Sequence, residues 1–200
     1  MLLQVLDYLG VAVFAVAGSI VASRKGLDFI AFLFFATLTG IGGGTLRDLI
    51  LGVPVFWLKS DGYLAVCLCV SIVMWFGASV VEGFGKPLRW ADAVGMAAYS
   101  VMGAAKALSV GETASVAVIM GVATATFGGI LRDVIAREPS AVIKSEIYLG
   151  AAFVGAGGYV ALHAFGLGGW LAATAAAFLA LVIRGGAIEF GWSMPGYKKS

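Results

Sequence analysis

Long apolar runs, separated by short polar or turn-forming segments, follow one another along the chain. A helix that spans a membrane needs about 20 mostly apolar residues. Transmembrane strands would instead give short segments of alternating polarity. The pattern therefore predicts an all-α integral membrane protein with seven transmembrane helices, and no soluble domain. The predicted helices occupy roughly residues 3–22, 28–50, 62–81, 91–109, 113–135, 146–164 and 167–184.

Composition supports this reading. The chain is 61% hydrophobic and 12% charged, with a mean hydropathy of +1.01. A soluble domain carries about 25% charged residues, and a disordered chain has low hydrophobicity and high charge. The net charge of +2 arises from 13 basic and 11 acidic residues, so a broad basic face for nucleic acid is not expected. These values exclude the soluble, disordered and nucleic-acid-binding classes.

The distribution of basic residues predicts the orientation in the membrane, because cytoplasmic loops are enriched in Lys and Arg. With the N-terminus outside, ten basic residues fall on the inner side and three on the outer side. We therefore expect the N-terminus outside and the C-terminus in the cytoplasm. The inner set is Arg24, Lys25, Lys86, Arg89, Arg132, Arg137, Lys144, Arg184, Lys198 and Lys199, and the outer set is Arg47, Lys59 and Lys106.

The chain also resembles itself at an offset of 85 residues. Each copy contains G-G-x-L-R-D, with a proline six residues beyond the Asp, at Pro54 and Pro139. We therefore predict a first three-helix repeat over 1–85, a second over 86–166, a seventh transmembrane helix over 167–185 and a cytoplasmic tail over 186–200. Because three spans are an odd number, the second repeat is expected to be inverted, as in many transport proteins.

Glycines cluster in the second helix of each repeat. Glycine costs about 1 kcal/mol relative to Ala in a helix interior, so adjacent glycines favour a kink or a break. Carbonyls freed at a break need partners from protein or pore water, and they and nearby hydroxyls could replace part of a cation's hydration shell. The alternative is that the glycines only allow close helix packing. The glycines are Gly42, Gly43, Gly44, Gly128 and Gly129, and the hydroxyls belong to Thr39, Thr45, Thr124 and Thr126.

Charged residues inside predicted spans are a second candidate site, because a charge at the bilayer centre costs about 2.5–3.5 kcal/mol on insertion scales. Asp partners for the two arginines could be the adjacent residues or residues of other helices. The sequence leaves open whether the group is a structural ion-pair network or has a role in permeation or gating. The group consists of Arg47, Asp48, Arg132, Asp133, Asp7 and Asp92.

Lys106 near the end of the fourth predicted span allows two interpretations. Its side chain could extend to the membrane interface, or it could serve as a gating charge or contact a lipid headgroup. Catalytic and cofactor motifs are lacking in the sequence: it has no P-loop, no G-x-S-x-G and no Cys/His cluster for a metal. We therefore expect neither an enzyme nor a bound cofactor.

The duplicated G-G-x-L-R-D, the proline after it and the seven-span layout resemble the prokaryotic trimeric intracellular cation (TRIC) channels. That family overlaps sequences described as glycine transporters. The resemblance implies a homotrimer in a bacterial or archaeal cell membrane, with a potassium-conducting pore in each subunit. It implies that the second and fifth helices, kinked at their glycines, line this pore. Phe127 departs from the pattern, because it stands where the first repeat has Gly42, and it is a candidate constriction.

Two transport hypotheses follow. The first is a passive channel for potassium or other monovalent cations. The second is a carrier for a small zwitterion such as glycine, with Arg binding the carboxylate and Asp the ammonium group. A structural membrane scaffold is a third possibility.

Overall fold

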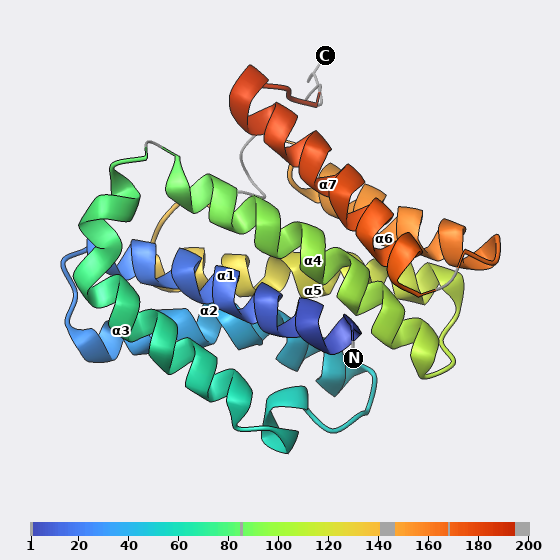
Figure 1. The fold of residues 1–200 in the computed structure, drawn as a ribbon, viewed down its shortest axis with the longest axis horizontal. Coiled ribbons are helices and arrows are strands. Elements are labelled where there is room, and N and C mark those ends of the chain that lie inside the picture. Colours follow the sequence, from blue (N-terminus) through green and yellow to red (C-terminus); the bar gives the residue numbers. More distant parts are fainter. Residues whose placement is uncertain (1, 85, 141–146, 168, 195–200) are drawn as a thin grey trace, which may run out of the picture.

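The computed structural model describes residues 2–84, 86–140, 147–167 and 169–194. In this part of the chain it contains seven α-helices and one short 3-10 helix, which confirms the all-α fold (Figure 1). The α-helices are α1 (Leu2–Arg24), α2 (Phe29–Ile50), α3 (Gly62–Glu82), α4 (Pro87–Ser109), α5 (Ala114–Ala136), α6 (Leu149–Ala164) and α7 (Trp170–Phe190), and η1 (Phe56–Lys59) lies between α2 and α3.

Two helix boundaries differ from the sequence prediction. Helix α4 starts at Pro87 rather than near residue 91, because proline suits the first turn of a helix. Helix α7 continues to Phe190, so the predicted division between the seventh helix and a tail at 185/186 is wrong. Gly185 and Gly186 do not end α7, since both are buried against tryptophan rings. Residue 146, the predicted start of the sixth span, and residues 195–200 of the predicted tail lie outside the described residues.

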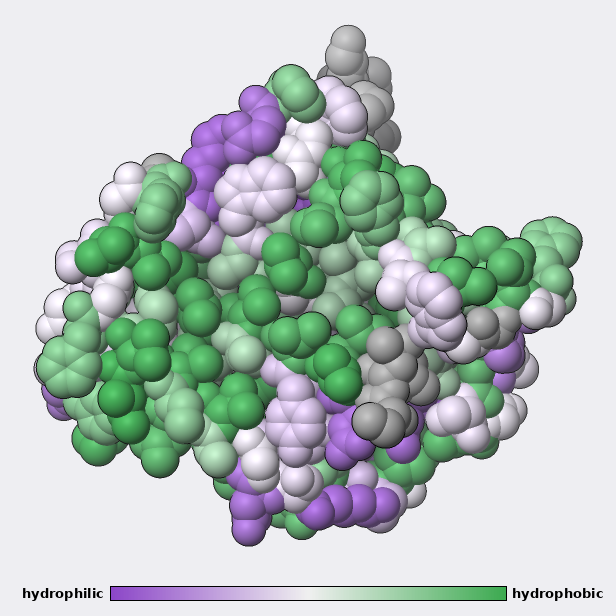
Figure 2. Space-filling view, in the orientation of Figure 1, coloured by the Kyte–Doolittle hydropathy of each residue, from purple (hydrophilic) through white to green (hydrophobic). Residues whose placement is uncertain are grey.

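The surface of the helix bundle suits a lipid environment. Helix α3 exposes large apolar side chains, including Leu68, Val73 and Phe76. In Figure 2, apolar residues cover much of the visible face, and hydrophilic residues gather mainly toward its margins. Within the described residues, five helices are long and apolar enough to cross a membrane. Helix α6 is shorter, with 16 described residues, and α4 is less apolar because it carries Arg89, Asp92 and Lys106.

Helices α1 and α4 pack through two equivalent contacts, in which each residue of one contact corresponds to a residue of the other at the 85-residue offset. Gly10 lies against the ring of Tyr99, and the equivalent Gly95 lies against the ring of Phe14. Phe14 and Tyr99 are themselves equivalent, and their ring centroids are 5.3 Å apart. As the numbers rise along α1 they fall along α4, so the helices run antiparallel here. Such an exchange is expected of two similar units that face each other across an approximate two-fold axis.

Helices α2 and α5 cross in the same reciprocal way. Gly43 lies against the backbone oxygen of Thr124, and Gly128 lies against the backbone oxygen of Thr39. Each residue of one pair is equivalent to a residue of the other pair at the 85-residue offset, and this crossing is also antiparallel. The repeated sequence is therefore matched by repeated contacts between the first and second groups of three helices.

Candidate functional site

Helices α2 and α5 continue through their glycines without interruption. The predicted breaks at Gly42–Gly44 and at Gly128–Gly129 are therefore wrong. The four threonine hydroxyls, expected beside freed carbonyls, instead donate hydrogen bonds to the carbonyl one turn earlier in the same helix. These bonds are Thr39 to Phe35 (2.7 Å), Thr45 to Ile41 (2.8 Å), Thr124 to Met120 (2.5 Å) and Thr126 to Val122 (2.9 Å).

Close packing explains the glycines instead. A Cβ atom at Gly43 or at Gly128 would overlap a backbone oxygen of the other helix, whereas at Gly42 the nearest atom would be a Leu131 methyl 3.4 Å away. Small residues allow helix backbones in a membrane to approach closely. The packing interpretation is thus the one that the structure supports, and two of the glycines form the point at which α2 and α5 touch.

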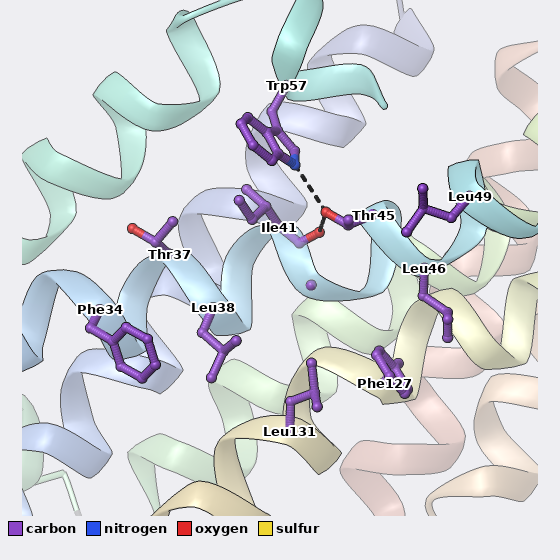
Figure 3. Close-up of a pocket in the computed structure, with 11 residues that line it drawn as sticks. Phe34, Thr37, Leu38, Ile41, Thr45, Leu46, Leu49, Trp57, Phe127 and Leu131 are labelled. Atoms are coloured by element: carbon purple, nitrogen blue, oxygen red, sulfur yellow. Dashed lines mark hydrogen bonds between the residues drawn. The ribbon is translucent and has the colours of Figure 1, made fainter. Parts of the chain in front are cut away.

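An apolar cleft of about 370 Å³ lies beside this crossing. Gly42 is one of its lining residues. Figure 3 labels four others, Thr45, Trp57, Phe127 and Leu131, which come from α2, η1 and α5. The hydroxyl of Thr45 accepts a hydrogen bond of 2.9 Å from the indole Nε1 of Trp57. The side of the crossing that holds Gly42 and Phe127 therefore faces a hydrophobic space and not a row of polar groups.

The charged residues form two clusters, one for each repeat. We call the cluster around Arg132 the second-repeat cluster. Arg132 is 2% exposed and makes a bidentate ion pair with Asp92, with Nη1–Oδ1 at 2.6 Å and Nη2–Oδ2 at 2.9 Å. Its Nε and Nη2 also donate to Oδ1 of the adjacent Asp133, at 2.9 and 2.8 Å. The prediction that Asp92 pairs with an arginine of another helix is confirmed.

Tyr148 and Arg184 complete the surroundings of the second-repeat cluster. Arg184 of α7 is buried, and its guanidinium carbon lies 5.1 Å from the centroid of the Tyr148 ring. Tyr148 lies in the field of Asp92, Arg132, Asp133 and Arg184. Sequence reasoning missed Arg184 as a site residue. The available signal was an arginine within the last apolar segment, where a charge is costly unless it has a partner.

We call the group around Arg47 the first-repeat cluster. The Nε of Arg47 donates to Oδ1 of Asp48 at 2.8 Å, and the other Asp48 oxygen accepts from the backbone N–H of Phe56 at 2.8 Å. The guanidinium carbon lies 5.6 Å from the centroid of the Phe56 ring. In the sequence, Asp48 and Arg47 are adjacent, and the pair nevertheless forms through the Nε atom, as it does at Arg132.

The expected pair between Asp7 and Arg47 differs from its counterpart. Asp7 accepts a 3.3 Å hydrogen bond from the Tyr63 hydroxyl through Oδ2. Its Oδ1 and the Nη1 of Arg47 are both buried, and neither has a hydrogen-bond partner among the described residues. Arg47, Asp48 and Lys106 all act electrostatically on Asp7, with Lys106 the weakest of the three. Asp7 and Arg47 are thus buried in one cluster without forming the bidentate pair.

Tyr63 is a second residue that sequence reasoning missed. It is equivalent to Tyr148 at the 85-residue offset, and each tyrosine accompanies the charged cluster of its own repeat. Both positions lie near the ends of apolar segments, where tyrosine is common because its ring suits the membrane–water interface. The offset is therefore the signal that separates these two tyrosines from ordinary interfacial ones. Among the described residues, no group of three or more His, Cys, Asp or Glu is arranged to hold a metal ion.

Comparison with known proteins gives a consistent family. A family model described as "Glycine transporter" matches residues 4–79 and again residues 89–164. The two matches are displaced by 85 residues, the same offset that relates the two clusters. A UPF0126 membrane protein of Vibrio cholerae is 38% identical over 98% of this chain and 83% of its own length.

Solved structures are also similar. A TRIC trimeric intracellular cation channel orthologue from Rhodobacter sphaeroides has a TM-score of 0.92 and 42% identity, and the match covers 96% of this chain and 99% of that one. A second structure, described as the structural basis for conductance through TRIC cation channels, has a TM-score of 0.88 and 29% identity. This match covers 100% of this chain and 99% of that one. These relatives are ion channels and not enzymes, in agreement with the sequence. The chain belongs to the TRIC family, of which the glycine transporter model describes the repeated unit.

Proposed function

We propose that this protein is a channel for monovalent cations, chiefly potassium, and that it works as a homotrimer with one pathway in each subunit. The observation that carries the proposal is the burial of Arg47 and Arg132 with carboxylates inside helices that are long and apolar enough to span a membrane. Ionisable groups at such positions are costly and mark ion or substrate pathways. The similarity to solved trimeric cation channels supports the same conclusion.

The pathway is proposed to run between α2 and α5. These helices are antiparallel where they cross, and each carries its Arg-Asp pair in its last two turns. The two clusters then lie toward opposite faces of the membrane, with the crossing of Gly43 and Gly128 between them. Backbone atoms meet at this crossing, so conduction requires α2 and α5 to move apart there. Phe127, one residue before Gly128, is the side chain placed to narrow the opened path.

The proposed membrane arrangement is an inverted repeat. Antiparallel contacts of α1 with α4 and of α2 with α5 support a two-fold axis in the membrane plane. The excess of basic residues favours a cytoplasmic C-terminus in a bacterial or archaeal cell membrane. In this orientation the first-repeat cluster faces the outside, the second-repeat cluster faces the cytoplasm, and Lys106 lies near the outer cluster.

Recording from purified protein in planar bilayers tests the proposal. We expect unitary current steps in potassium solutions, with little current when potassium is replaced by the large cation N-methyl-D-glucamine. Absence of unitary current from protein that still elutes as a folded oligomer would contradict the channel assignment.

A carrier for glycine is a second candidate, because two observations favour it. The matching family model is described as a glycine transporter. The unpaired Nη1 of Arg47 and Oδ1 of Asp7 could also bind the carboxylate and the ammonium group of one small zwitterion. Saturable uptake of radiolabelled glycine into proteoliposomes, without unitary current, would support the carrier and exclude the channel.

A further inference from the structure

We propose that Asp7 binds the permeant cation directly, at the position that the guanidinium of Arg132 occupies on Asp92 in the second repeat. The proposal rests on the cation conduction proposed above and assigns it a binding residue. It follows from a comparison of equivalent atoms in the two clusters.

The two clusters agree in most of their contacts. Arg47 donates through Nε to Asp48 at 2.8 Å, and Arg132 donates through Nε to Asp133 at 2.9 Å. They differ at the carboxylate of the first helix in each repeat. Both oxygens of Asp92 accept from Arg132, whereas Oδ1 of Asp7 has no partner among the described residues. The carboxylate that lacks its guanidinium is the one with an oxygen available to a cation.

Burial makes this available oxygen significant. Asp7 is 8% exposed and lies in a helix long and apolar enough to span the membrane. A buried carboxylate oxygen without a hydrogen bond is unfavourable, and the penalty falls when a cation binds to it. Asp92 has already met this requirement through Arg132. The same argument applied to both repeats thus predicts one such cation site in each subunit, at Asp7.

The charges around Asp7 favour a cation. Asp7 and Asp48 contribute two carboxylates, and Arg47 contributes one guanidinium, which is held by Asp48 and by the face of Phe56. These three groups together carry one formal negative charge, and Lys106, which is not included in this count, acts on Asp7 more weakly than Arg47 or Asp48. The unpaired Nη1 of Arg47 can donate to a water molecule of the ion's hydration shell, so a hydrated cation satisfies both unpaired atoms.

The aromatic residues beside Asp7 add to the site. Tyr63 donates to the second oxygen of Asp7 at 3.3 Å and stacks on Tyr8, with ring centroids 4.2 Å apart. The Tyr8 and Ser60 hydroxyls lie 3.1 Å apart. Carboxylate and hydroxyl oxygens are the ligands that hard cations prefer, and aromatic faces attract cations. The tyrosine pair therefore holds Asp7 in place and offers a surface compatible with a partly dehydrated monovalent ion.

The test uses thallium(I), a monovalent cation close to potassium in size, in crystals of the wild-type protein grown with thallium in place of potassium. Thallium scatters anomalously, so its position is measured directly. We expect an anomalous peak within coordination distance of Asp7 Oδ1 and none at Asp92, which serves as the internal control. We also expect excess potassium to reduce the peak. No peak at Asp7, or equal peaks at both carboxylates, would overturn the proposal.

The Asp7→Asn variant gives a second readout, because an amide at this position carries no charge for the ion. The peak should disappear while the variant still elutes as an oligomer. A persisting peak would refute the role of Asp7, and if the variant does not fold, the wild-type comparison decides alone. Potassium currents without a thallium peak would reject only the site. A peak in a protein that carries no current would reject the channel and retain the site.

Discussion

The two charged clusters contain the same residue types at the same offset. In only one of them does the arginine form a bidentate ion pair with the aspartate of the first helix in its repeat. In the second-repeat cluster, Arg132 engages both oxygens of Asp92 and acts electrostatically on Tyr148, whose ring also lies beside Arg184 of α7. In the first-repeat cluster, Arg47 lies over Phe56 of η1, and one oxygen of Asp7 has no hydrogen-bond partner within the part of the chain that the structure describes. The duplicated motif therefore brings equivalent groups together in both repeats, whereas α7, which lies outside the two repeats, contributes Arg184 beside Tyr148 in the second-repeat cluster.

The largest loss of stability is expected from removing the arginine side chain of the second-repeat cluster. Arg132→Ala leaves Asp92 and Asp133 buried without their shared cation, and removing one partner of a buried ion pair costs about 3–5 kcal/mol. Arg47→Ala also breaks a buried ion pair, but among the described residues it removes one hydrogen bond to a carboxylate where Arg132→Ala removes four, so its cost should be the smaller of the two. Thermal unfolding of both variants in the same detergent measures the difference. Equal destabilisation would contradict the difference between the two clusters, because it would mean that both arginines contribute equally to stability.

The helix crossing should respond next. In Gly43→Ala the added methyl would overlap the backbone oxygen of Thr124, and overpacking costs about 1–3 kcal/mol. Gly42→Ala is the matched control, because its methyl has room beside Leu131 and Ala improves helix propensity by about 1 kcal/mol. Unfolding midpoints should fall for the first variant and stay level or rise for the second. The reverse order would contradict the reciprocal packing of α2 and α5.

The smallest effect concerns the tyrosine of the first-repeat cluster. Tyr63→Phe removes the hydrogen bond to Asp7, and a bond of this kind contributes about 1 kcal/mol. Tyr8→Phe serves as the control, because it removes a hydroxyl that hydrogen-bonds with Ser60 and leaves the hydrogen bond from Tyr63 to Asp7 in place. Conductance at low potassium should fall in the first variant more than in the second. Identical conductances would indicate that Tyr63 does not position Asp7.

Much of this organisation could be predicted from the sequence. Long continuous apolar runs predicted seven helices, and the shared G-G-x-L-R-D located the two arginines and their adjacent Asp residues. Asp28 and Thr113, equivalent at the 85-residue offset, cap α2 and α5 through their side chains, so even the helix starts repeat. These features depend on local residue type, which a sequence displays.

Other features depended on tertiary contacts. The glycines predict either a break or close packing, and the choice is made by the carbonyls of Thr39 and Thr124, which belong to the opposite helix. The sequence also does not show that Asp92 forms a bidentate ion pair while Asp7 does not, because the two carboxylates occupy equivalent positions in the two repeats. A cluster of glycines or a charge in an apolar segment therefore indicates the position of a site, but it does not predict which contacts form there.

In the proposed pathway, a cation crosses between the two repeats and binds the carboxylate of Asp7 on its way. Single-channel recording of the wild-type protein and of Asp7→Asn, at low potassium on both sides, tests this most directly. We expect unitary potassium currents in the wild-type protein and a clearly lower unitary conductance in the variant. Absence of unitary current in the wild-type protein, or the same conductance in both proteins, would contradict it.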